Sequence, residues 1–382
     1  MARILYIQDR MKNKAGMERI LTAKINYLAQ HTDHHLFLLT YEQSGAPLAF
    51  ELDKSVQYIP IDNIIPLRKD YSLLKWLIKY LNARKQFRKN IMQEIEQTNP
   101  DIIICNVYSF SVIDIIIRIA TSLDIKTIIE SHTKLSSTFM SYKFHYNKTL
   151  YYLTKKWDQT ILHRLKSTSC VVALTKQDAI DWKPYVKNII VIPNFITIEP
   201  QLVKDYSVKR VITAGRYSYE KGYDMLLQAW AIVIKDYPDW QLHIFGDEDR
   251  SPYIKISELL KIRDSVFLHP STTDIAKEFS KSSIYVLSSR YEGFGLVLAE
   301  AMSCGLACIS FDCPYGPRNI IIEQQDGVLV ESENTEELSK ALVSFMTDYQ
   351  KRKKYGIRAS ENIKRFEKKN IMSHWIKLFN NI

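Results

Sequence analysis

The sequence predicts an α/β protein made of two doubly wound domains, each with a mostly parallel β-sheet. Short runs rich in Ile, Val and Leu on both alternating positions, as in strands buried on two faces, alternate with longer amphipathic stretches. This alternation occurs twice along the 382 residues, a length that suits two domains. Residues 193–209, a polar stretch without clear periodicity, separate the two series.

The first series runs from the start of the chain to about residue 192. Its expected strands are residues 3–8, 36–40, 56–59, 101–105, 126–130, 170–174 and 189–192. Its expected helices are residues 17–30, 72–97, 111–122 and 148–166. Strands that alternate with helices pair in parallel, so helices should cover both faces of one sheet.

The second series repeats the pattern after residues 193–209, which we expect to be a linker. Its expected strands are residues 210–214, 241–245, 265–268, 283–287, 306–310 and 327–330. Its expected helices are residues 221–236, 252–262, 273–280, 295–303 and 335–347, followed by a last helix at about 366–380. Two such domains imply a cleft, with ligands outside the carboxyl ends of the strands.

The composition is that of an ordinary globular protein with a basic first half. Apolar residues make up 46% of the chain and charged residues 25%. The net charge is +10, and residues 1–200 hold 27 Lys and Arg against 18 Asp and Glu. An anionic partner such as phosphate, nucleic acid or anionic lipid would explain this excess, and a basic face that only favours solubility is the alternative.

Cysteine content and hydropathy bear on the compartment. The five cysteines are odd in number and mostly lie in apolar runs, so we expect reduced, buried thiols in a cytoplasmic protein. The chain opens on a strand-like segment without the pattern of a signal peptide. Its longest uncharged stretch, residues 102–113, is too short to span a bilayer. We therefore expect a soluble protein, or one that lies on a membrane surface.

A glycine-containing turn, residues 215–222 (GRYSYEKG), follows the first strand of the second series. Glycine lets the backbone turn sharply and approach a ligand. Arg216 and Lys221 place two cations near a helix start, where free N–H groups also favour anions. The turn lacks the ending of a Walker loop but fits a diphosphate, and an ordinary basic loop is the alternative.

Two glutamates bracket a second glycine turn in the segment EGFGLVLAE. Glu292 would lie in the loop, and Glu300 about two turns into the following helix. The residues between them are apolar, so the helix is buried, and a buried carboxylate is costly without a partner. Sugar or ribose hydroxyls would be suitable partners, and a surface lysine is the alternative. Free N–H groups near Phe294, Gly295 and Leu296 can donate hydrogen bonds to a phosphate.

Together, the G-R-x-x-x-E-K-G turn and the E-G-F-G-L-V-L-A-E segment resemble the signature of family 4 glycosyltransferases, the group 1 type found in bacterial polysaccharide synthesis. Shorter segments that also resemble the family pattern lie in the expected order, at residues 16–19, 172–176, 192–194, 244–247 and 314–318. The resemblance covers essentially the whole chain. The sequence departs from the family pattern at Ala15, where a second glycine is common, and at Glu248, where a glycine often stands.

The resemblance implies a GT-B fold and a retaining, metal-independent transfer from a nucleotide-diphosphate sugar. Residues 1–195 would bind the acceptor and residues 196–364 the donor, with a helix at about 365–382 packing back on the first domain.

The resemblance also implies roles for single residues. Arg216 and Lys221 would hold the diphosphate and neutralise the leaving group, a form of electrostatic stabilisation. Glu292 would bind hydroxyls of the donor sugar, and Glu300 the ribose. Gly16 would lie against the phosphates from across the cleft. The other donor-binding residues would be Gly215, Gly293, Phe294, Gly295 and Leu296.

His132 is a further candidate, because it follows the expected strand 126–130 at its carboxyl end. In the family a histidine in this neighbourhood often contacts the donor sugar, and an imidazole can donate a hydrogen bond there. A loop histidine with an ordinary partner is the alternative. The acidic run 247–249 lies in the wrong context for a metal-binding D-x-D pair, so we expect no metal and no cofactor.

The segment 68–90 is basic and amphipathic, with Trp76 and several other apolar and aromatic residues. Such a helix suits an anionic membrane surface or a lipid diphosphate, and a core-facing helix with a basic solvent face is the alternative. The aromatic, lysine-containing segment 142–157 adds a little weight to the surface interpretation. No RNA-binding motif accompanies these residues, so we expect no nucleic acid.

We therefore predict a cytoplasmic glycosyltransferase, peripheral on the inner face of the cell membrane, that adds a sugar to a lipid-linked or surface-polysaccharide glycan. UDP is the expected nucleotide, with GDP and a water-soluble acceptor as alternatives. A non-catalytic GT-B partner subunit would tend to lose the donor-site charges that this chain keeps. A GT-B sugar-nucleotide epimerase would lack this pairing of motifs.

Overall fold

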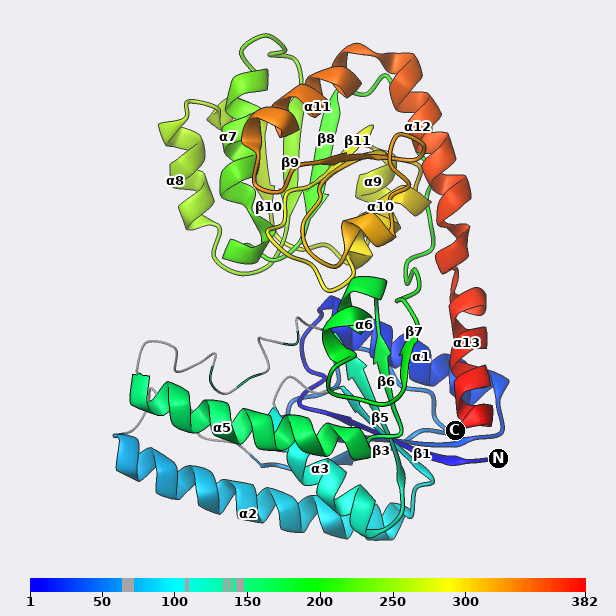
Figure 1. Ribbon diagram of the computed structural model, residues 1–382. Coiled ribbons are helices and arrows are strands. Elements are labelled where there is room, and N and C mark those ends of the chain that lie inside the picture. Colours follow the sequence, from blue (N-terminus) through cyan, green and yellow to red (C-terminus); the bar gives the residue numbers. More distant parts are fainter. Residues whose placement is uncertain (64–71, 107–109, 133–134, 136–138, 140, 142–147) are drawn as a thin grey trace. The chain divides into compact units, whose positions relative to one another are not determined.

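A computed structural model describes the chain except for residues 64–71, 107–109, 133–134, 136–138, 140 and 142–147. Its contacts divide the chain into two compact units. Unit 1 comprises Met1–Ile192 and Met372–Ile382, and unit 2 comprises Pro193–Ile371. Each unit is built on its own parallel sheet (Figure 1).

Unit 1 has, in its described residues, seven parallel strands in the order β3-β2-β1-β4-β5-β6-β7. The strands are β1 (Arg3–Gln8), β2 (His35–Thr40), β3 (Gln57–Pro60), β4 (Ile102–Asn106), β5 (Lys126–Ser131), β6 (Cys170–Ala173) and β7 (Ile189–Val191). The helices are α1 (Gly16–His31), α2 (Leu73–Thr98), α3 (Phe110–Ser122), α5 (Lys148–Arg164), α6 (Lys176–Trp182) and the end of α13 (Lys368–Asn381). The strand order reverses between β1 and β4, and sheets of this kind bind ligands at such a reversal.

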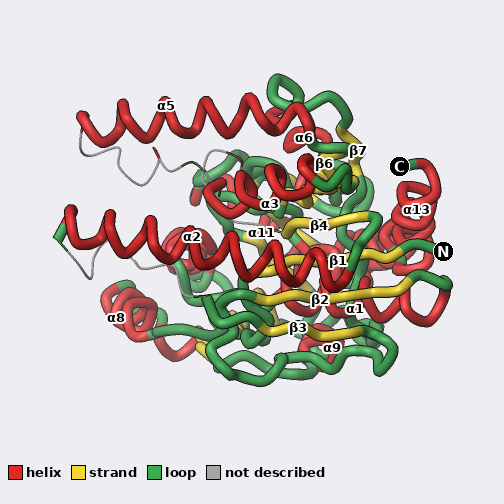
Figure 2. The backbone as a smooth tube through the Cα atoms, turned by 90° about the horizontal axis from the view of Figure 1, so that it is seen from below, coloured by secondary structure: helices red, strands yellow, loops and turns green. Residues whose placement is uncertain are grey.

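Both faces of this sheet are buried, as its runs of Ile, Val and Leu require. Leu5 and Ile7 of β1 belong to a core that includes buried side chains of α2, α3 and α5. Side chains alternate along a strand, so Tyr6 faces the other way, toward Lys24 of α1. The elements on the first face are tied together by the buried carboxylate of Asp114 in α3, which pairs with Arg84 of α2 and Arg164 of α5. Figure 2 shows α3 lying between these two long helices.

Unit 2 has six parallel strands in the order β10-β9-β8-β11-β12-β13. The strands are β8 (Arg210–Ala214), β9 (Gln241–Phe245), β10 (Val266–His269), β11 (Ile284–Leu287), β12 (Ala307–Phe311) and β13 (Val328–Val330). The helices are α7 (Tyr223–Val233), α8 (Ser251–Leu259), α9 (Ile275–Ser280), α10 (Leu296–Ser303), α11 (Thr335–Thr347) and α12 (Tyr349–Asn362). Here the strand order reverses between β8 and β11.

Helix α12 is absent from the sequence prediction because its residues are mostly polar. Asp348 caps its first turn by accepting a hydrogen bond from the N–H of Lys351 at 2.8 Å. The buried guanidinium of Arg352 donates to the carbonyl of Tyr206 at 2.9 and 3.0 Å. A Cβ on Gly356 would lie 2.2 Å from the carbonyl oxygen of Gly305, so only glycine permits this close packing. Backbone contacts, rather than an apolar stripe, hold this helix in place.

The expected linker at 193–209 is largely packed onto unit 2. The N–H of Ile196 donates to the carbonyl of Phe366 at 3.0 Å, and that of Val203 to the carbonyl of Cys304 at 2.9 Å. The Tyr206 hydroxyl donates to the carbonyl of Gly305 at 2.8 Å. The segment lacks periodicity because its polar groups bind the loops and helix ends of unit 2.

Two expectations about hydropathy and thiols can be compared with the structure. Within the described part of the chain, no helix combines the length and the apolar character needed to cross a bilayer. All five cysteines are buried and form no disulfide, so the expected burial is confirmed.

Candidate active site

The predicted donor-site residues of unit 2 gather at the reversal of strand order between β8 and β11. Gly215 follows β8 directly, and Glu292 lies in the loop after β11. These strands are neighbours and run parallel, so their carboxyl ends meet at one edge of the sheet. This edge is where a ligand of an open α/β sheet is expected.

Two glycines shape the turn at residues 215–222. A Cβ on Gly215 would lie 2.9 Å from the Lys221 Cε atom, so glycine lets this lysine side chain pass over the backbone. Gly222 has a φ of 61°, and a Cβ there would lie 2.1 Å from the carbonyl oxygen of Ser288. A side chain at Gly215 would therefore displace the Lys221 side chain, and one at Gly222 would push the turn away from the residue that follows β11.

Arg290, which the sequence analysis missed, anchors the same turn. Its guanidinium donates to both carboxylate oxygens of Asp224 in α7, at 2.7 and 3.0 Å, and to the carbonyl of Tyr219 at 2.7 Å. The Arg290 N–H donates to the carbonyl of Glu220 at 2.8 Å. Arg290, in the loop after β11, thus holds the backbone of the turn in place without any ligand.

The structure brings Lys221 and Glu292 into one ion pair, although 71 positions separate them in the sequence. The Lys221 Nζ lies 2.8 Å from Glu292 Oε1, and the Ser289 hydroxyl donates to the same oxygen at 2.6 Å. The two charged side chains are only 18% and 12% exposed. A mostly buried pair of opposite charges can orient sugar hydroxyls and phosphate oxygens with little rearrangement.

Arg216 lies apart from this pair. Its side chain is 58% exposed and reaches Glu248 at 3.4 Å, which is a loose surface contact. Such a contact costs little to break, so the guanidinium is available to a diphosphate. The departure from the family pattern at Glu248 thus supplies the partner of this arginine.

The second predicted motif forms a turn into the buried helix α10. Phe294 is buried and meets Phe366 edge to face at 5.3 Å. Gly295 has a φ of 91° and is the N-cap of α10, so Leu296 begins the helix after Gly293 and Phe294. The first N–H groups of a helix have no partner within it, which favours an anion at this end. The segment 314–318 supports Glu292 from behind, since a Cβ on Gly316 would lie 2.8 Å from the Glu292 Cβ.

Glu300 is buried inside α10, with 1% of its surface exposed. Its Oε1 accepts a hydrogen bond from the Thr197 hydroxyl at 2.8 Å. The alternative of a surface lysine as partner is therefore wrong, because the helix is buried and a threonine hydroxyl meets the carboxylate. Sequence analysis could not find Thr197, which lies in the stretch expected to be a linker.

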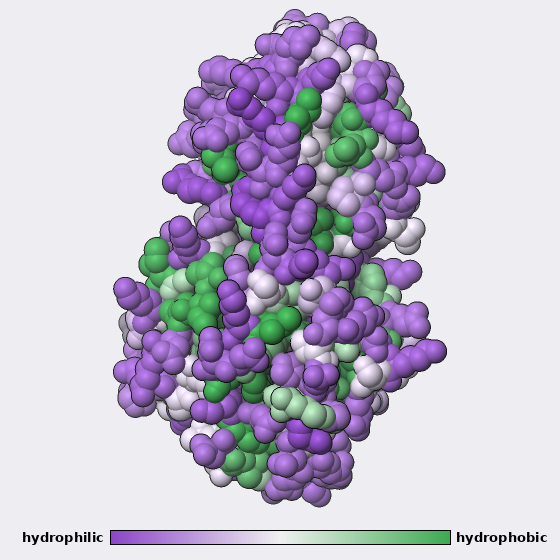
Figure 3. All heavy atoms as spheres, turned by 90° about the vertical axis from the view of Figure 1, so that its right-hand side faces the viewer, coloured by the Kyte–Doolittle hydropathy of each residue, from purple (hydrophilic) through white to green (hydrophobic). Residues whose placement is uncertain are grey.

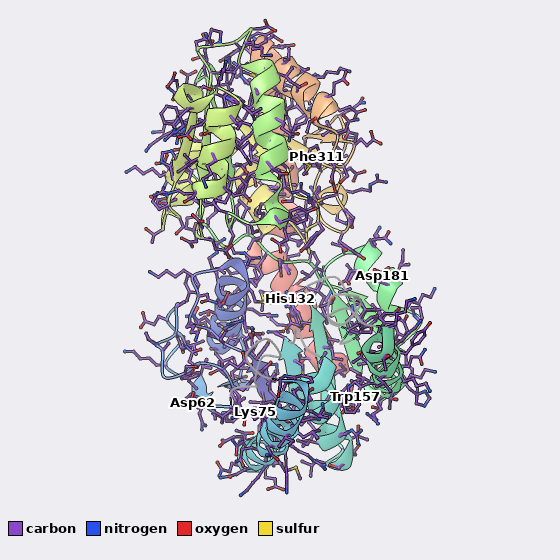
Figure 4. All side chains as sticks on the ribbon, turned by 90° about the vertical axis from the view of Figure 1, so that its left-hand side faces the viewer. Asp62, Lys75, His132, Trp157, Asp181 and Phe311 are labelled. Atoms are coloured by element: carbon purple, nitrogen blue, oxygen red, sulfur yellow. The ribbon has the colours of Figure 1, made fainter. Side chains whose placement is uncertain are left out.

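Gly16 and His132 belong to unit 1, whereas the other predicted site residues belong to unit 2. Gly16 is the first residue of α1, after Ala15 in extended conformation. His132 follows β5, at the carboxyl end of the unit 1 sheet (Figure 4). Its Nε2 lies 3.0 Å from Glu130 Oε2, so a buried carboxylate holds the ring.

Lys24 and Glu130, which the sequence motifs did not mark, complete this cluster. The Lys24 Nζ contacts both carboxylate oxygens of Glu130 at 2.5 Å and lies 4.1 Å from the ring centroid of Trp375. Burial alone would raise the pKa of Glu130, but Lys24 and His132 outweigh it and hold that pKa below its ordinary value. The signal in the sequence was a lysine on the apolar face of an amphipathic helix, between Leu21 and Leu28.

Among the residues that the structure describes, no group of three or more His, Cys, Asp or Glu side chains is arranged to hold a metal ion. Metal independence remains a prediction.

Comparison with known proteins places these features in a family. Residues 15–200 match the model described as Glycosyltransferase Family 4, and residues 194–362 match the model described as Glycosyl transferases group 1. An uncharacterised glycosyltransferase of Haemophilus influenzae is 29% identical, over 86% of this chain and 85% of that protein. The amylovoran biosynthesis glycosyltransferase AmsD of Erwinia amylovora is 26% identical over the full length of both chains.

A solved structure shows that the likeness of fold extends over the whole chain. A mutant of S. aureus TarM, crystallised with fondaparinux, α-GlcNAc-glycerol and UDP, superimposes with a TM-score of 0.76. The match covers 100% of both chains at 17% sequence identity.

Proposed function

The chain belongs to the family 4, group 1 glycosyltransferases, and from this premise we propose that it moves a sugar from a UDP-sugar to a hydroxyl of a glycan acceptor. The two parallel-sheet units have the GT-B fold, as the sequence resemblance implied. Retention of the anomeric configuration and independence of metal are part of the proposal.

The Lys221–Glu292 pair at the β8/β11 reversal is the observation that carries this proposal. It places one cation and one carboxylate, both mostly buried, beside the start of α10. A nucleotide-diphosphate sugar needs both types of group, because its phosphates are anionic and its sugar offers hydroxyls. A diphosphate alone would need only the cations and the helix start.

In the proposed reaction, the bond between the anomeric carbon and the diphosphate oxygen breaks. The acceptor oxygen bonds to that carbon on the same face, and the proton of the acceptor hydroxyl passes to the departing diphosphate. Lys221 and Arg216 would stabilise the negative charge that develops on the leaving oxygen. Glu292 would hold sugar hydroxyls, and Glu300, with Thr197, the ribose.

UDP is the proposed nucleotide because the TarM structure of the same fold contains UDP. The test is thermal unfolding of the protein with UDP, GDP or ADP, each with and without EDTA. A ligand that binds only the folded state raises the melting temperature with concentration. We expect a rise with UDP that survives EDTA. A rise only with GDP would mean that the donor nucleotide is GDP and not UDP. Loss of the UDP-induced rise in EDTA would contradict metal independence. No rise with any of the three nucleotides would contradict the proposed donor site.

The acceptor is proposed to be lipid-linked, because unit 1 exposes apolar and basic side chains together. Leu77, Ile78 and Leu81 of α2 are 44%, 55% and 52% exposed. Tyr152 and Leu153 of α5 are also exposed. The segments 68–71 and 142–147 of the two predicted surface stretches lie outside the described residues.

The two helices share a contact, since the guanidinium of Arg84 lies 5.0 Å from the ring centroid of Trp157. Figure 4 marks Lys75 on α2 and Trp157 on α5. Exposed apolar side chains among lysines and arginines suit an anionic membrane surface, where a lipid-linked glycan would be presented.

A further inference from the structure

The carboxyl end of β5 presents a buried cluster of charged groups that the proposed transfer does not itself explain. Glu130 is the residue before the last of this strand and lies on the face toward α1, where Lys24 contacts both of its carboxylate oxygens. The side chains of Lys24 and Glu130 are only 4% and 2% exposed. An ion pair buried this deeply adds little net stability, so its geometry points to a role in positioning a neighbouring group.

The cluster fixes one nitrogen of the His132 ring. Nε2 lies 3.0 Å from Glu130 Oε2, and a carboxylate can only accept, so the ring donates its Nε2 proton. In a neutral imidazole the other nitrogen, Nδ1, then carries a lone pair and accepts hydrogen bonds. Lys24 already compensates the charge of Glu130, and burial lowers the pKa of His132, so the ring stays neutral.

The groups facing His132 come from several elements. Glu130 lies on β5, Lys24 on α1, and the buried Tyr6 on β1 beneath the Lys24 ammonium, 5.7 Å from it. Trp375 of α13 covers the same ammonium. Ser131 points to the opposite face of the sheet, where its hydroxyl donates to Asp178 of α6 at 3.0 Å. Among the described residues on the α1 face, the pair Lys24 and Glu130 therefore sets the charge next to the ring.

We propose that Lys24 and Glu130 are positioning residues that hold His132 as the neutral Nε2–H tautomer, so that Nδ1 accepts a hydrogen bond from a substrate hydroxyl. This assigns the ring the role of acceptor, whereas the sequence suggested a donor. The contact with a sugar hydroxyl rests on the proposed function, but the tautomer and its dependence on Lys24 do not. A tautomer fixed by a carboxylate is a known device for orienting an imidazole.

The test is nuclear magnetic resonance of the full chain labelled with ¹⁵N in histidine, with His132→Asn used to assign the ring signals. The wild-type ring should be neutral near neutral pH, with its proton on Nε2. Lys24→Met should raise the pKa of His132 by about one unit or more, because Glu130 loses its other cation. Glu130→Gln should lower that pKa. Lys126→Met, at the exposed start of β5, is the matched control and should change nothing.

Two results would overturn the proposal. One is a wild-type ring with its proton on Nδ1, or protonated on both nitrogens near neutral pH. The other is an unchanged His132 pKa in folded Lys24→Met. Should that variant not fold, the double variant Lys24→Met/Glu130→Gln removes both charges together, and the wild-type tautomer still decides the matter. In this double variant the His132 ring should stay neutral near neutral pH, so a protonated ring would also count against the proposal.

A kinetic readout separates this proposal from the proposed function. With UDP-N-acetylglucosamine or UDP-glucose as donor and water as acceptor, Glu130→Gln should lower kcat on the order of tenfold or more. Its UDP-induced rise in melting temperature should equal that of the wild type, because the predicted UDP site lies in unit 2. Loss of UDP binding in both proteins would instead refute the donor site and leave the tautomer result standing.

Discussion

The proposed donor site of unit 2 depends on individual residues whose partners were not visible in the sequence. Lys221 and Glu292 meet through a turn that Gly215 and Gly222 allow and that Arg290 anchors. Lys221→Met should lower turnover of a UDP-sugar by about a hundredfold or more, because it removes a cation aimed at the leaving diphosphate. It should also reduce the rise in melting temperature that UDP causes.

The matched control is Lys354→Met, the same change at an exposed lysine of α12. Steady-state rates and thermal unfolding of both variants would be measured together. The control should behave as wild type. Equal rates in all three proteins would mean that Lys221 has no part in the chemistry.

Asp178 provides a prediction about pH. Burial raises the pKa of its carboxyl from 3.8 to about 6, although hydrogen bonds from Ser131 and the backbone oppose the rise. Between about pH 4 and about pH 6 the folded protein keeps a proton that the unfolded chain has released. The contribution of this group to the free energy of unfolding is therefore largest at low pH and falls as the pH rises through about 6.

Asp178→Asn removes this titration and keeps an oxygen that can accept from Ser131. Relative to wild type, the variant should be more stable at about pH 7 than at about pH 4.5, by on the order of 2 kcal/mol. Urea unfolding at the two pH values measures this difference. A difference of the opposite sign would show that the folded protein favours the ionised carboxylate.

Single residues were predictable from sequence where a motif marked them, as with Arg216, Lys221, Glu292 and Glu300. Lys24 and Thr197 were not, because their roles depend on partners 106 and 103 positions away. The position of a lysine on the apolar face of α1 was a usable signal, since a buried lysine needs a carboxylate. No comparable pattern surrounded Thr197.

The positions of helices, strands and turns depend on close backbone contacts as well as on the burial of apolar side chains. The contact at Gly222 allows this dependence to be tested. Gly222→Ala should lower the free energy of unfolding by more than about 2 kcal/mol, because its Cβ would meet the carbonyl oxygen of Ser288, directly after β11. Gly45→Ala is the matched control, since Gly45 also has a positive φ, 69°, but no atom within 4 Å of the added Cβ.

The control should cost only about 1 kcal/mol, from backbone strain alone. Chemical denaturation of both variants gives the comparison. A similar loss in the two would mean that the turn at 219–222 can shift away from β11. In that case the UDP response of Gly222→Ala should be weaker than that of the wild type, because Lys221 would move away from Glu292 with the turn.

The strands of both sheets were predictable to within about one residue, because Ile, Val and Leu fill both alternating positions of strands buried on two faces. Helix α7 begins at Tyr223 rather than 221, since Gly222 adopts a left-handed conformation and ends the preceding turn. Helix α12 was missed because Arg352 and Gly356 bind backbone atoms and leave no apolar stripe. Apolar periodicity thus predicts elements that bury side chains, and fails where the backbone itself is packed.

Over the whole molecule, charge and apolar surface are unequally distributed. Residues 1–200 carry 27 Lys and Arg against 18 Asp and Glu, so a net of +9 out of +10 lies in this part of the chain. On the side shown in Figure 3, apolar side chains are more frequent over unit 1 than over unit 2. The excess of positive charge lies in the part of the chain that holds α2 and α5.

Binding to membranes is therefore expected to depend on unit 1 and on ionic strength. The protein should bind phosphatidylglycerol-containing vesicles more tightly than phosphatidylcholine vesicles, and added salt should weaken this binding. Lys75→Gln/Lys79→Gln should lower the partition on the order of thirtyfold, since each basic residue near the surface contributes about 1 kcal/mol. Lys353→Gln/Lys354→Gln, two exposed lysines of α12, is the matched control in unit 2. Vesicle sedimentation measures all three. Equal binding by the two double variants would mean that the basic face of α2 serves solubility alone, and the acceptor would then be sought among water-soluble glycans.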